Sequence, residues 1–144
     1  MTQTASIYEA LGGTAVMPTS SCSLEELREQ IRHGLPFSAL EALMVKFDLG
    51  REEVSEALHL PPRTLTRRKA ERLLRPDESD RLVRLASVAA RAVEVLGSSA
   101  KASRWLQRSN RSLGGQVPLE LLDTSVGTRQ VEEVLGRLED GVYS

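Results

Sequence analysis

RTLTRRK, residues 63–69, places four cations and two hydroxyl groups on a short segment that is expected to form a helix. The segment lies in the most basic part of the chain. Residues 59–76 contain six Lys and Arg and one acidic residue, a net charge of +5. Residues 1–58 contain four basic and nine acidic residues (−5), and residues 77–144 contain nine basic and ten acidic residues (−1). The three segments sum to the formal net charge of −1. A nearly neutral chain with one basic segment is expected to bind a polyanion locally and in a salt-sensitive way. A solvated basic helix face would give the same pattern.

The residues before this segment predict a short helix and a tight turn. Residues 51–60 are amphipathic, with inward positions at Val54, Ala57 and Leu58. Pro61 ends this helix because proline disfavours helical geometry in the preceding residue, and Pro62 suits the first turn of the next helix. A short helix, a tight turn and a basic helix follow one another in a helix-turn-helix DNA reader.

The remaining patterns predict an all-α fold. The expected helices begin at Ser23 and Ser38, each with capping-box spacing to a glutamate, and then span residues 77–96, 100–108 and 118–122, with a final helix after Gly127. The stripe Val131, Val134, Leu135 and Leu138 must be buried against the domain or a partner. Three parts are expected: a flexible lead-in over residues 1–22, a helix-turn-helix domain over residues 23–76 and a C-terminal helical domain over residues 77–144.

The sequence offers no site for catalysis, for a metal or for a cofactor. Neither His33 nor His59 has ligand-type neighbours at metal-binding spacing, and Cys22 is the single cysteine. Gly114-Gly115 lacks the residues of a phosphate-binding loop, and neighbouring carboxylates such as Glu52-Glu53 diverge around a helix. We therefore expect a non-enzymatic, soluble protein of the cytoplasm, without a membrane-spanning segment.

The second half of the chain resembles a known family. The residues that carry the resemblance are Arg67-Arg68-Lys69, Glu78-Ser79-Asp80-Arg81-Leu82, Trp105-Leu106, Asn110, Leu113-Gly114-Gly115, Pro118, Leu121-Leu122, Thr124, Gly127, Val131 and Gly141-Val142-Tyr143-Ser144. They are similar to the Xre/MbcA/ParS antitoxins, over about residues 24–144. Many relatives have proline where this chain has Ser109.

The resemblance implies an Xre-like helix-turn-helix domain that represses its operon and a C-terminal domain that covers the NAD pocket of a RES-domain toxin. The implied DNA-binding residues are Arg63, Thr64, Thr66 and Arg67, with Arg68 and Lys69 as phosphate anchors. The implied toxin-binding residues are Leu138, Glu139, Asp140, Gly141, Val142, Tyr143 and Ser144, although a terminus of this kind is ordinarily frayed. Operator DNA, the toxin and a second copy in a homodimer are the expected partners.

The residues alone leave two questions open: the role of Trp105 and the function of the whole chain. Trp105 is expected to anchor the C-terminal core, and partner contact is the less favoured role. The chain could also be a stand-alone helix-turn-helix regulator whose C-terminal helices dimerise or sense a ligand. That regulator would have no toxic neighbour.

Overall fold

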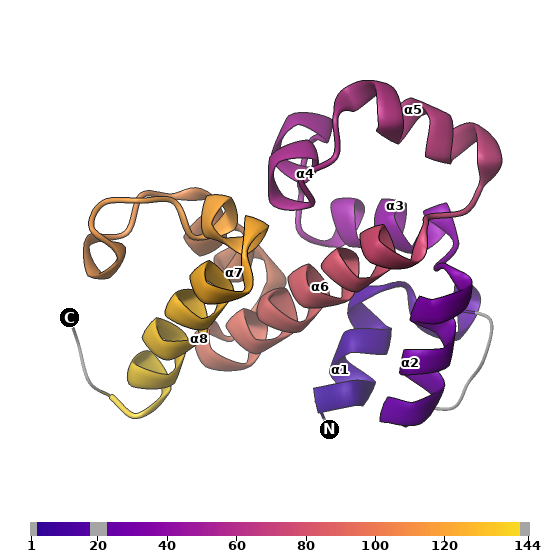
Figure 1. Cartoon of the computed structure of the whole chain (residues 1–144). Coiled ribbons are helices and arrows are strands. Elements are labelled where there is room, and N and C mark those ends of the chain that lie inside the picture. Colours follow the sequence, from indigo (N-terminus) through magenta and orange to yellow (C-terminus); the bar gives the residue numbers. More distant parts are fainter. Residues whose placement is uncertain (1–2, 18–22, 142–144) are drawn as a thin grey trace.

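A helix of 21 residues, α6, runs through the middle of the molecule (Figure 1). The computed structural model describes residues 3–17 and 23–141, in which the chain forms helices and two isolated β-bridges but no strand. In chain order the elements are α1 (Gln3–Ala10), η1 (Gly13–Ala15), α2 (Leu24–His33), α3 (Phe37–Lys46), α4 (Arg51–Ala57), α5 (Pro62–Glu71), α6 (Pro76–Leu96), α7 (Ser99–Gln107), η2 (Arg111–Leu113), η3 (Pro118–Asp123) and α8 (Ser125–Glu139).

Helix α6 connects the two parts of the fold. Its apolar face is buried, including Leu82, Ala86 and Ala89 as the sequence predicts, and the helix ends at Gly97. It packs against α1 and α2 and also against α7 and α8. One hydrophobic core extends from α1 to α8, so the helix-turn-helix part and the C-terminal part share buried side chains.

The structure of residues 3–17 corrects the expectation that residues 1–22 form a flexible lead-in. Residues 1–22 lack a sustained period, yet residues 3–10 form α1, which packs along α6. Ile7, Leu11 and Met17 are buried in the common core. The helix is short and its apolar residues are few, so its order comes from burial against α6 rather than from its own periodicity. Cys22 lies outside the described residues.

The start of α3 is a second correction. The spacing of Ser38 and Glu41 predicts a capping box with Ser38 as the N-cap, but the N-cap is Pro36, two residues earlier, and the helix begins at Phe37. The Phe37 backbone N–H donates to the Arg72 carbonyl at 3.1 Å, and Pro36 pairs with Leu73 in a β-bridge. A contact with the distant segment after α5 therefore sets this boundary. By contrast, Ser23 caps α2 as expected, accepting from the Glu26 N–H at 3.1 Å.

A close backbone contact holds the loop after α2 against the loop after α5. Gly34 ends α2 with φ of +93°, and a Cβ at this position would lie 2.2 Å from the Leu74 carbonyl oxygen. Only glycine permits both this φ and this approach. The Leu74 N–H in turn donates to the Leu35 carbonyl at 2.9 Å. The loops that follow α2 and α5 are thus held together beside the first turn of α6.

The C-terminal part is built from α7, η2, η3 and α8. Val131, Val134 and Leu135 of α8 are buried within the domain and Leu138 packs partly against it, which answers where the predicted stripe is buried. Gly127 lies inside the first turn of α8 rather than before the helix, which Thr124 caps. Trp105 is only partly buried, whereas its neighbour Leu106 is fully buried and anchors α7 in the core.

Candidate functional site

The helix-turn-helix consists of α4, a tight turn and α5. The Gly50 N–H at the start of α4 donates to Glu53 Oε1 at 2.8 Å. After α4 the chain turns at His59, which has a left-handed φ of 53°, and the Leu60 N–H donates to the Ser55 carbonyl at 2.9 Å. Pro62 occupies the first turn of α5, as the sequence predicts. Leu65 is buried beneath α5 and presses this helix against the fold.

The outer face of α5 carries most of the sequence-predicted DNA-binding residues. Arg63, Thr66, Arg67 and Lys69 are exposed, and Thr64 is half-buried. Arg67 Nη2 lies 3.5 Å from Thr64 Oγ1. The guanidinium groups of Arg63 and Arg67 and the Thr66 hydroxyl therefore share one solvent-facing surface, which can meet phosphate oxygens and base edges, whereas Lys69 Nζ lies 4.0 Å from Glu41 Oε2 of α3.

Arg51 is an additional cation of this surface that the sequence reasoning missed. It is the first residue of α4, and its Nη2 donates to Thr66 Oγ1 at 2.9 Å and to the Pro62 carbonyl at 3.3 Å. The contact joins the start of α4 to the exposed face of α5 and holds the Thr66 hydroxyl in place. No spacing rule shows a pair fifteen residues apart across a turn.

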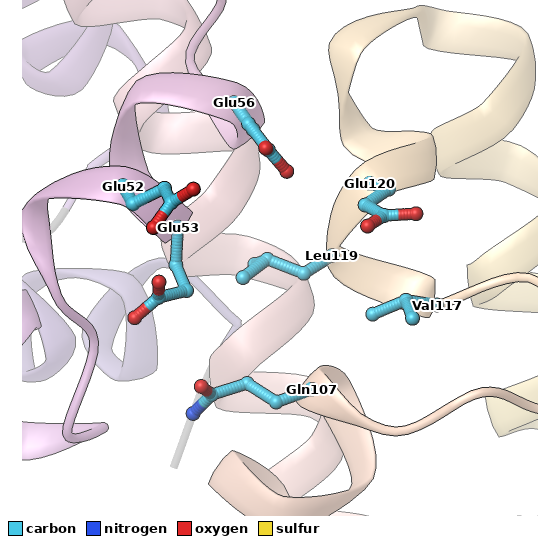
Figure 2. Close-up of a pocket in the computed structure, with 7 residues that line it drawn as sticks. All are labelled: Glu52, Glu53, Glu56, Gln107, Val117, Leu119 and Glu120. Atoms are coloured by element: carbon cyan, nitrogen blue, oxygen red, sulfur yellow. The ribbon is translucent and has the colours of Figure 1, made fainter. Parts of the chain in front are cut away.

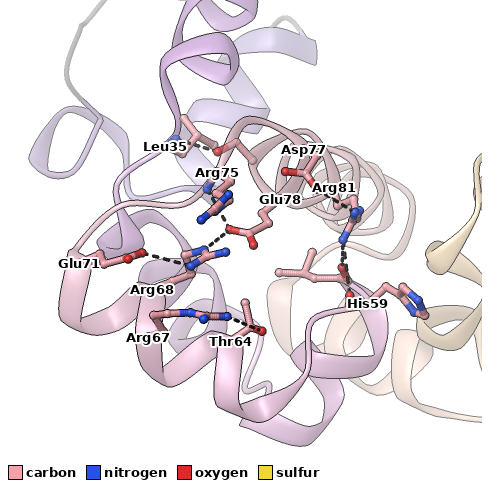
Figure 3. A network of polar contacts seen from close by, with 12 residues as sticks. Leu35, His59, Thr64, Arg67, Arg68, Glu71, Arg75, Asp77, Glu78 and Arg81 are labelled. Carbon is pink, nitrogen blue, oxygen red and sulfur yellow. Dashed lines mark hydrogen bonds and ion pairs between the residues drawn. The ribbon is translucent and has the colours of Figure 1, made fainter.

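Arg68 departs from its expected role as a phosphate anchor. Its side chain is only 4 % exposed and points into the fold, where Nε donates to Glu78 Oε1 at 2.7 Å and Nη1 to Glu71 Oε1 at 3.1 Å (Figure 3). The Glu78 carboxylate also accepts the Arg75 N–H at 2.8 Å. Arg68 is thus committed to holding α5 on the first turn of α6 through the buried Glu78, whereas Glu71 lies on α5 itself and is half exposed.

The Arg68–Glu78 pair shifts the pKa of both groups. The hydrogen bond to Glu78 raises the pKa of Arg68 against the opposing effect of burial. Burial alone would raise the pKa of Glu78, but the hydrogen bonds from Arg68 and from the Arg75 N–H outweigh it and leave that pKa below its ordinary value. Both groups therefore stay charged over the whole physiological range.

A second arginine ties the turn to α6. Arg81 Nη1 donates to the Leu58 carbonyl at 2.9 Å, and Nη2 donates to Asp77 Oδ2 at 3.1 Å (Figure 3). The first contact satisfies a carbonyl at the end of α4, which a helix terminus otherwise leaves without a partner. Arg68 and Arg81 together fix α4 and α5 on α6.

An acidic groove lies between α4 and η3. It has a volume of about 320 Å³, and Glu120 faces α4 from the opposite wall (Figure 2). The groove is lined by Glu52, Glu53, Glu56, Gln107, Val117, Leu119 and Glu120. None of its four carboxylates lies within 4.0 Å of a cationic group in the described part of the chain. Its charge is opposite to that of the α5 surface, so it does not extend a surface for phosphate.

The sequence-predicted toxin-binding residues lie at the end of α8. Leu138 packs against the core, Glu139 Oε1 accepts from Arg91 Nη2 at 2.7 Å, and Asp140 follows the last helical residue. Gly141 turns the chain with φ of +76°. Val142, Tyr143 and Ser144 lie outside the described residues. The structure thus fixes the base of this tail on α6.

Two sequence models of one antitoxin family match the chain. The Antitoxin Xre-like helix-turn-helix domain matches residues 26–87, and the Antitoxin Xre/MbcA/ParS C-terminal toxin-binding domain matches residues 91–141. An Antitoxin Xre of Yersinia enterocolitica is 30% identical over 145 residues, which cover 99% of this chain and 94% of that relative. The chain belongs to the Xre antitoxin family.

Other Xre antitoxins are similar over parts of the chain. That of Pseudomonas putida is 42% identical over 83 residues (57% of this chain and 52% of the relative), and that of Photorhabdus laumondii is 29% identical over 126 residues (86% and 85%). As an Xre-type antitoxin, the chain consists of a DNA-binding helix-turn-helix domain followed by a toxin-binding domain. The first match ends and the second begins within α6. Among the described residues, no helix has the length and apolar character needed to span a bilayer.

Proposed function

We propose that this antitoxin neutralises a RES-domain toxin that degrades NAD and represses the promoter of its own operon, acting in the cytoplasm as a homodimer. The observation that supports DNA binding is the outer face of α5, where Arg63, Arg67 and Lys69 are exposed and Thr66 accepts a hydrogen bond from Arg51. The match of residues 91–141 to a toxin-binding domain carries the other half.

On operator DNA, α5 enters the major groove and α4 crosses the phosphate backbone. Arg67 and Arg63 are suited to bidentate contacts with guanine or phosphate, whereas Lys69 supplies a point charge. A single helix-turn-helix unit covers little DNA, so two copies on a palindromic site are expected. Sedimentation of the protein with its promoter fragment tests this dimer, and a monomer on a single half-site would contradict it.

The tail from Leu138 to Ser144 enters the toxin's NAD pocket in this proposal. The Arg91–Glu139 contact at 2.7 Å anchors its base, and Tyr143 offers apolar area and a hydroxyl group to a nucleotide pocket. A chain that ends at Asp140 retains the anchor and removes only residues 141–144. We expect it to bind promoter DNA normally and to lose protection.

Expression of the RES-domain protein encoded beside this gene tests the function as a whole. Growth should stop when that protein is expressed alone and should return when the full chain is expressed with it, and the two proteins should purify together. The chain that ends at Asp140 serves as the matched variant, because its helices are complete. No growth arrest, or no rescue by the full chain, would refute the neutralising role; full rescue by the shortened chain would refute the tail.

A further inference from the structure

A basic hollow lies on the C-terminal domain, away from α5. It has a volume of about 440 Å³ and is formed mainly by α7 and the loop that follows it. The residues that give it its character are Leu96, Lys101, Arg104, Trp105, Arg108 and Arg111. Neither the helix-turn-helix nor the tail uses these residues.

Helix periodicity explains how α7 builds this hollow. Lys101 and Arg104 are three residues apart in α7, so their side chains share one face of the helix, and Arg108 follows directly as the C-cap residue. The opposite face, with Ala102 and Leu106, is buried in the core. Trp105 lies between these faces: part of its indole packs against the core and part lines the hollow.

The loop after α7 is held in a defined shape. The Asn110 N–H donates to the Gln116 carbonyl at 2.9 Å, and the Gly115 N–H donates to the Asn110 carbonyl at 2.8 Å. Asn110 Oδ1 accepts the Ser112 N–H at 2.9 Å. These bonds close the loop and place Arg111 at the edge of the hollow without the aid of a ligand.

The positive charge of the hollow has no partner in the fold. Lys101, Arg104, Arg108 and Arg111 are exposed, and within the described residues no carboxylate lies within 4.0 Å of any of them. No acidic residue occurs between Glu94 and Glu120 in the sequence. Four cations around a partly exposed indole suit a partner that supplies negative charge and an apolar contact.

An acidic protein surface fits the hollow better than DNA does. Helix α4 lies between α5 and the C-terminal domain (Figure 1), and the acidic groove follows the side of α4 that faces η3. A duplex that extends from α5 toward the hollow would meet the carboxylates of Glu52, Glu56 and Glu120 and would be repelled. Tryptophan and arginine are also the residues that most often dominate the energy of protein interfaces.

We propose that the basic hollow around Trp105 is a docking surface for an acidic patch of the toxin, separate from the tail that enters the pocket. The inference rests on the proposed function, and the position of the hollow within the toxin-binding domain agrees with it. The cations steer and orient the toxin, and Trp105 supplies the buried contact at the centre. The acidic groove keeps the DNA-binding and toxin-binding surfaces apart.

Trp105 gives a direct reporter, because it is the single tryptophan of the chain. The full chain labelled with 5-fluorotryptophan has one ¹⁹F resonance. We expect this resonance to shift in the complex with the RES-domain protein encoded beside the gene and to stay unchanged with promoter DNA. An unchanged resonance in the toxin complex would overturn the proposal. A shift with DNA would instead assign the hollow to nucleic acid.

Charge reversal measures the contribution of the cations. The double variant Arg104→Glu/Arg108→Glu should bind the toxin at least about thirtyfold more weakly than the unaltered chain, the scale of truncating one interface hot spot. Its promoter affinity should not change. The matched control, Arg28→Glu/Arg129→Glu, makes the same charge change at exposed positions of α2 and α8 and should bind the toxin normally.

The outcomes separate this inference from the proposed function. If the unaltered chain does not bind the toxin, the proposed function fails. If the unaltered chain and both double variants bind it equally, only the docking surface fails. Equal weakening by both double variants would mean that overall charge attracts the toxin, which would also overturn the docking surface. All four substituted side chains are exposed, and circular dichroism checks that each variant keeps its fold.

Discussion

Arg68 Nε donates to Glu78 Oε1 at 2.7 Å, and both side chains are about 95 % buried, with 4% and 5% exposed. This pair joins α5, the second helix of the helix-turn-helix, to the first turn of α6, the helix that continues into the toxin-binding domain. The most basic segment of the chain therefore has two roles. Arg63 and Arg67 on its outer face make no ion pair among the described residues and are the proposed DNA contacts, and the inner Arg68 holds the helix in position.

Replacing the inner cation should cost stability. Arg68→Met leaves Glu78 charged and buried without its main partner, and breaking a buried pair in this way costs about 3–5 kcal/mol. We expect the free energy of unfolding in urea, followed by circular dichroism, to fall by an amount of this order. Arg67→Ala, next to it on the exposed face, should leave the unfolding free energy nearly unchanged. Equal stability of the two variants would contradict the role of Arg68.

The same pair predicts a pH dependence. The pKa of Glu78 is lower in the folded protein than its ordinary value of 4.5, so the carboxylate stabilises the fold above that pH. This contribution should decline as the pH falls below 4.5 and be lost once the pH passes the folded-state pKa. Glu78→Gln should be less stable at neutral pH and should lose less stability on acidification. Parallel acid unfolding curves for the two proteins would argue against the pair.

The first helix should contribute to the stability of the whole fold. Leu11, directly after α1, is fully buried, so Leu11→Ala should cost about 2–5 kcal/mol by leaving a cavity. Glu9→Ala, on the exposed side of α1, is the control and should change stability by less than about 0.5 kcal/mol. Thermal unfolding measures both. An unaffected Leu11→Ala would restore the idea of a weakly ordered N-terminus.

Two glycines of α8 provide a matched pair. A Cβ at Gly127 would lie 2.0 Å from the Leu121 carbonyl oxygen, whereas a Cβ at Gly136 would meet nothing within 4 Å. Gly127→Ala should destabilise by about 1–3 kcal/mol, because backbone must move to make room. Gly136→Ala should stabilise by about 0.5–1 kcal/mol, because alanine favours the helix. Loss of stability in both variants, or in neither, would contradict the close packing of η3 on α8.

Local sequence patterns were sufficient to predict the helices whose boundaries depend on local interactions. Residues 77–96 predict α6 to within one residue, because their apolar period is long and Gly97 ends it. The order of α4, turn and α5 followed from Pro61 and Pro62. The burial of Arg68 could also have been predicted in part, because Arg68 lies three residues after Leu65 and therefore on the same face of α5.

Features that depend on distant contacts could not be predicted from the sequence. Helix α1 is ordered by α6, and the hydrogen bond from Gln3 to Ser87 joins residues that are 84 positions apart in the chain. The start of α3 depends on the Arg72 carbonyl, and the position of Thr66 depends on Arg51. No periodicity shows such pairs. The basic hollow was missed for a different reason: its cations lie within eleven residues, but the loop that adds Arg111 to the face of α7 has no periodicity.

The central claim is that one chain controls DNA and toxin through separate surfaces, and Arg67→Ala tests it in a single experiment. Cells that express the RES-domain toxin and carry a reporter under the operon's promoter are scored for growth and for reporter signal. We expect Arg67→Ala to protect growth as well as the unaltered chain and to weaken repression, by about 1–3 kcal/mol of operator affinity. Undiminished repression by Arg67→Ala, or failure of the unaltered chain to protect growth, would contradict the claim.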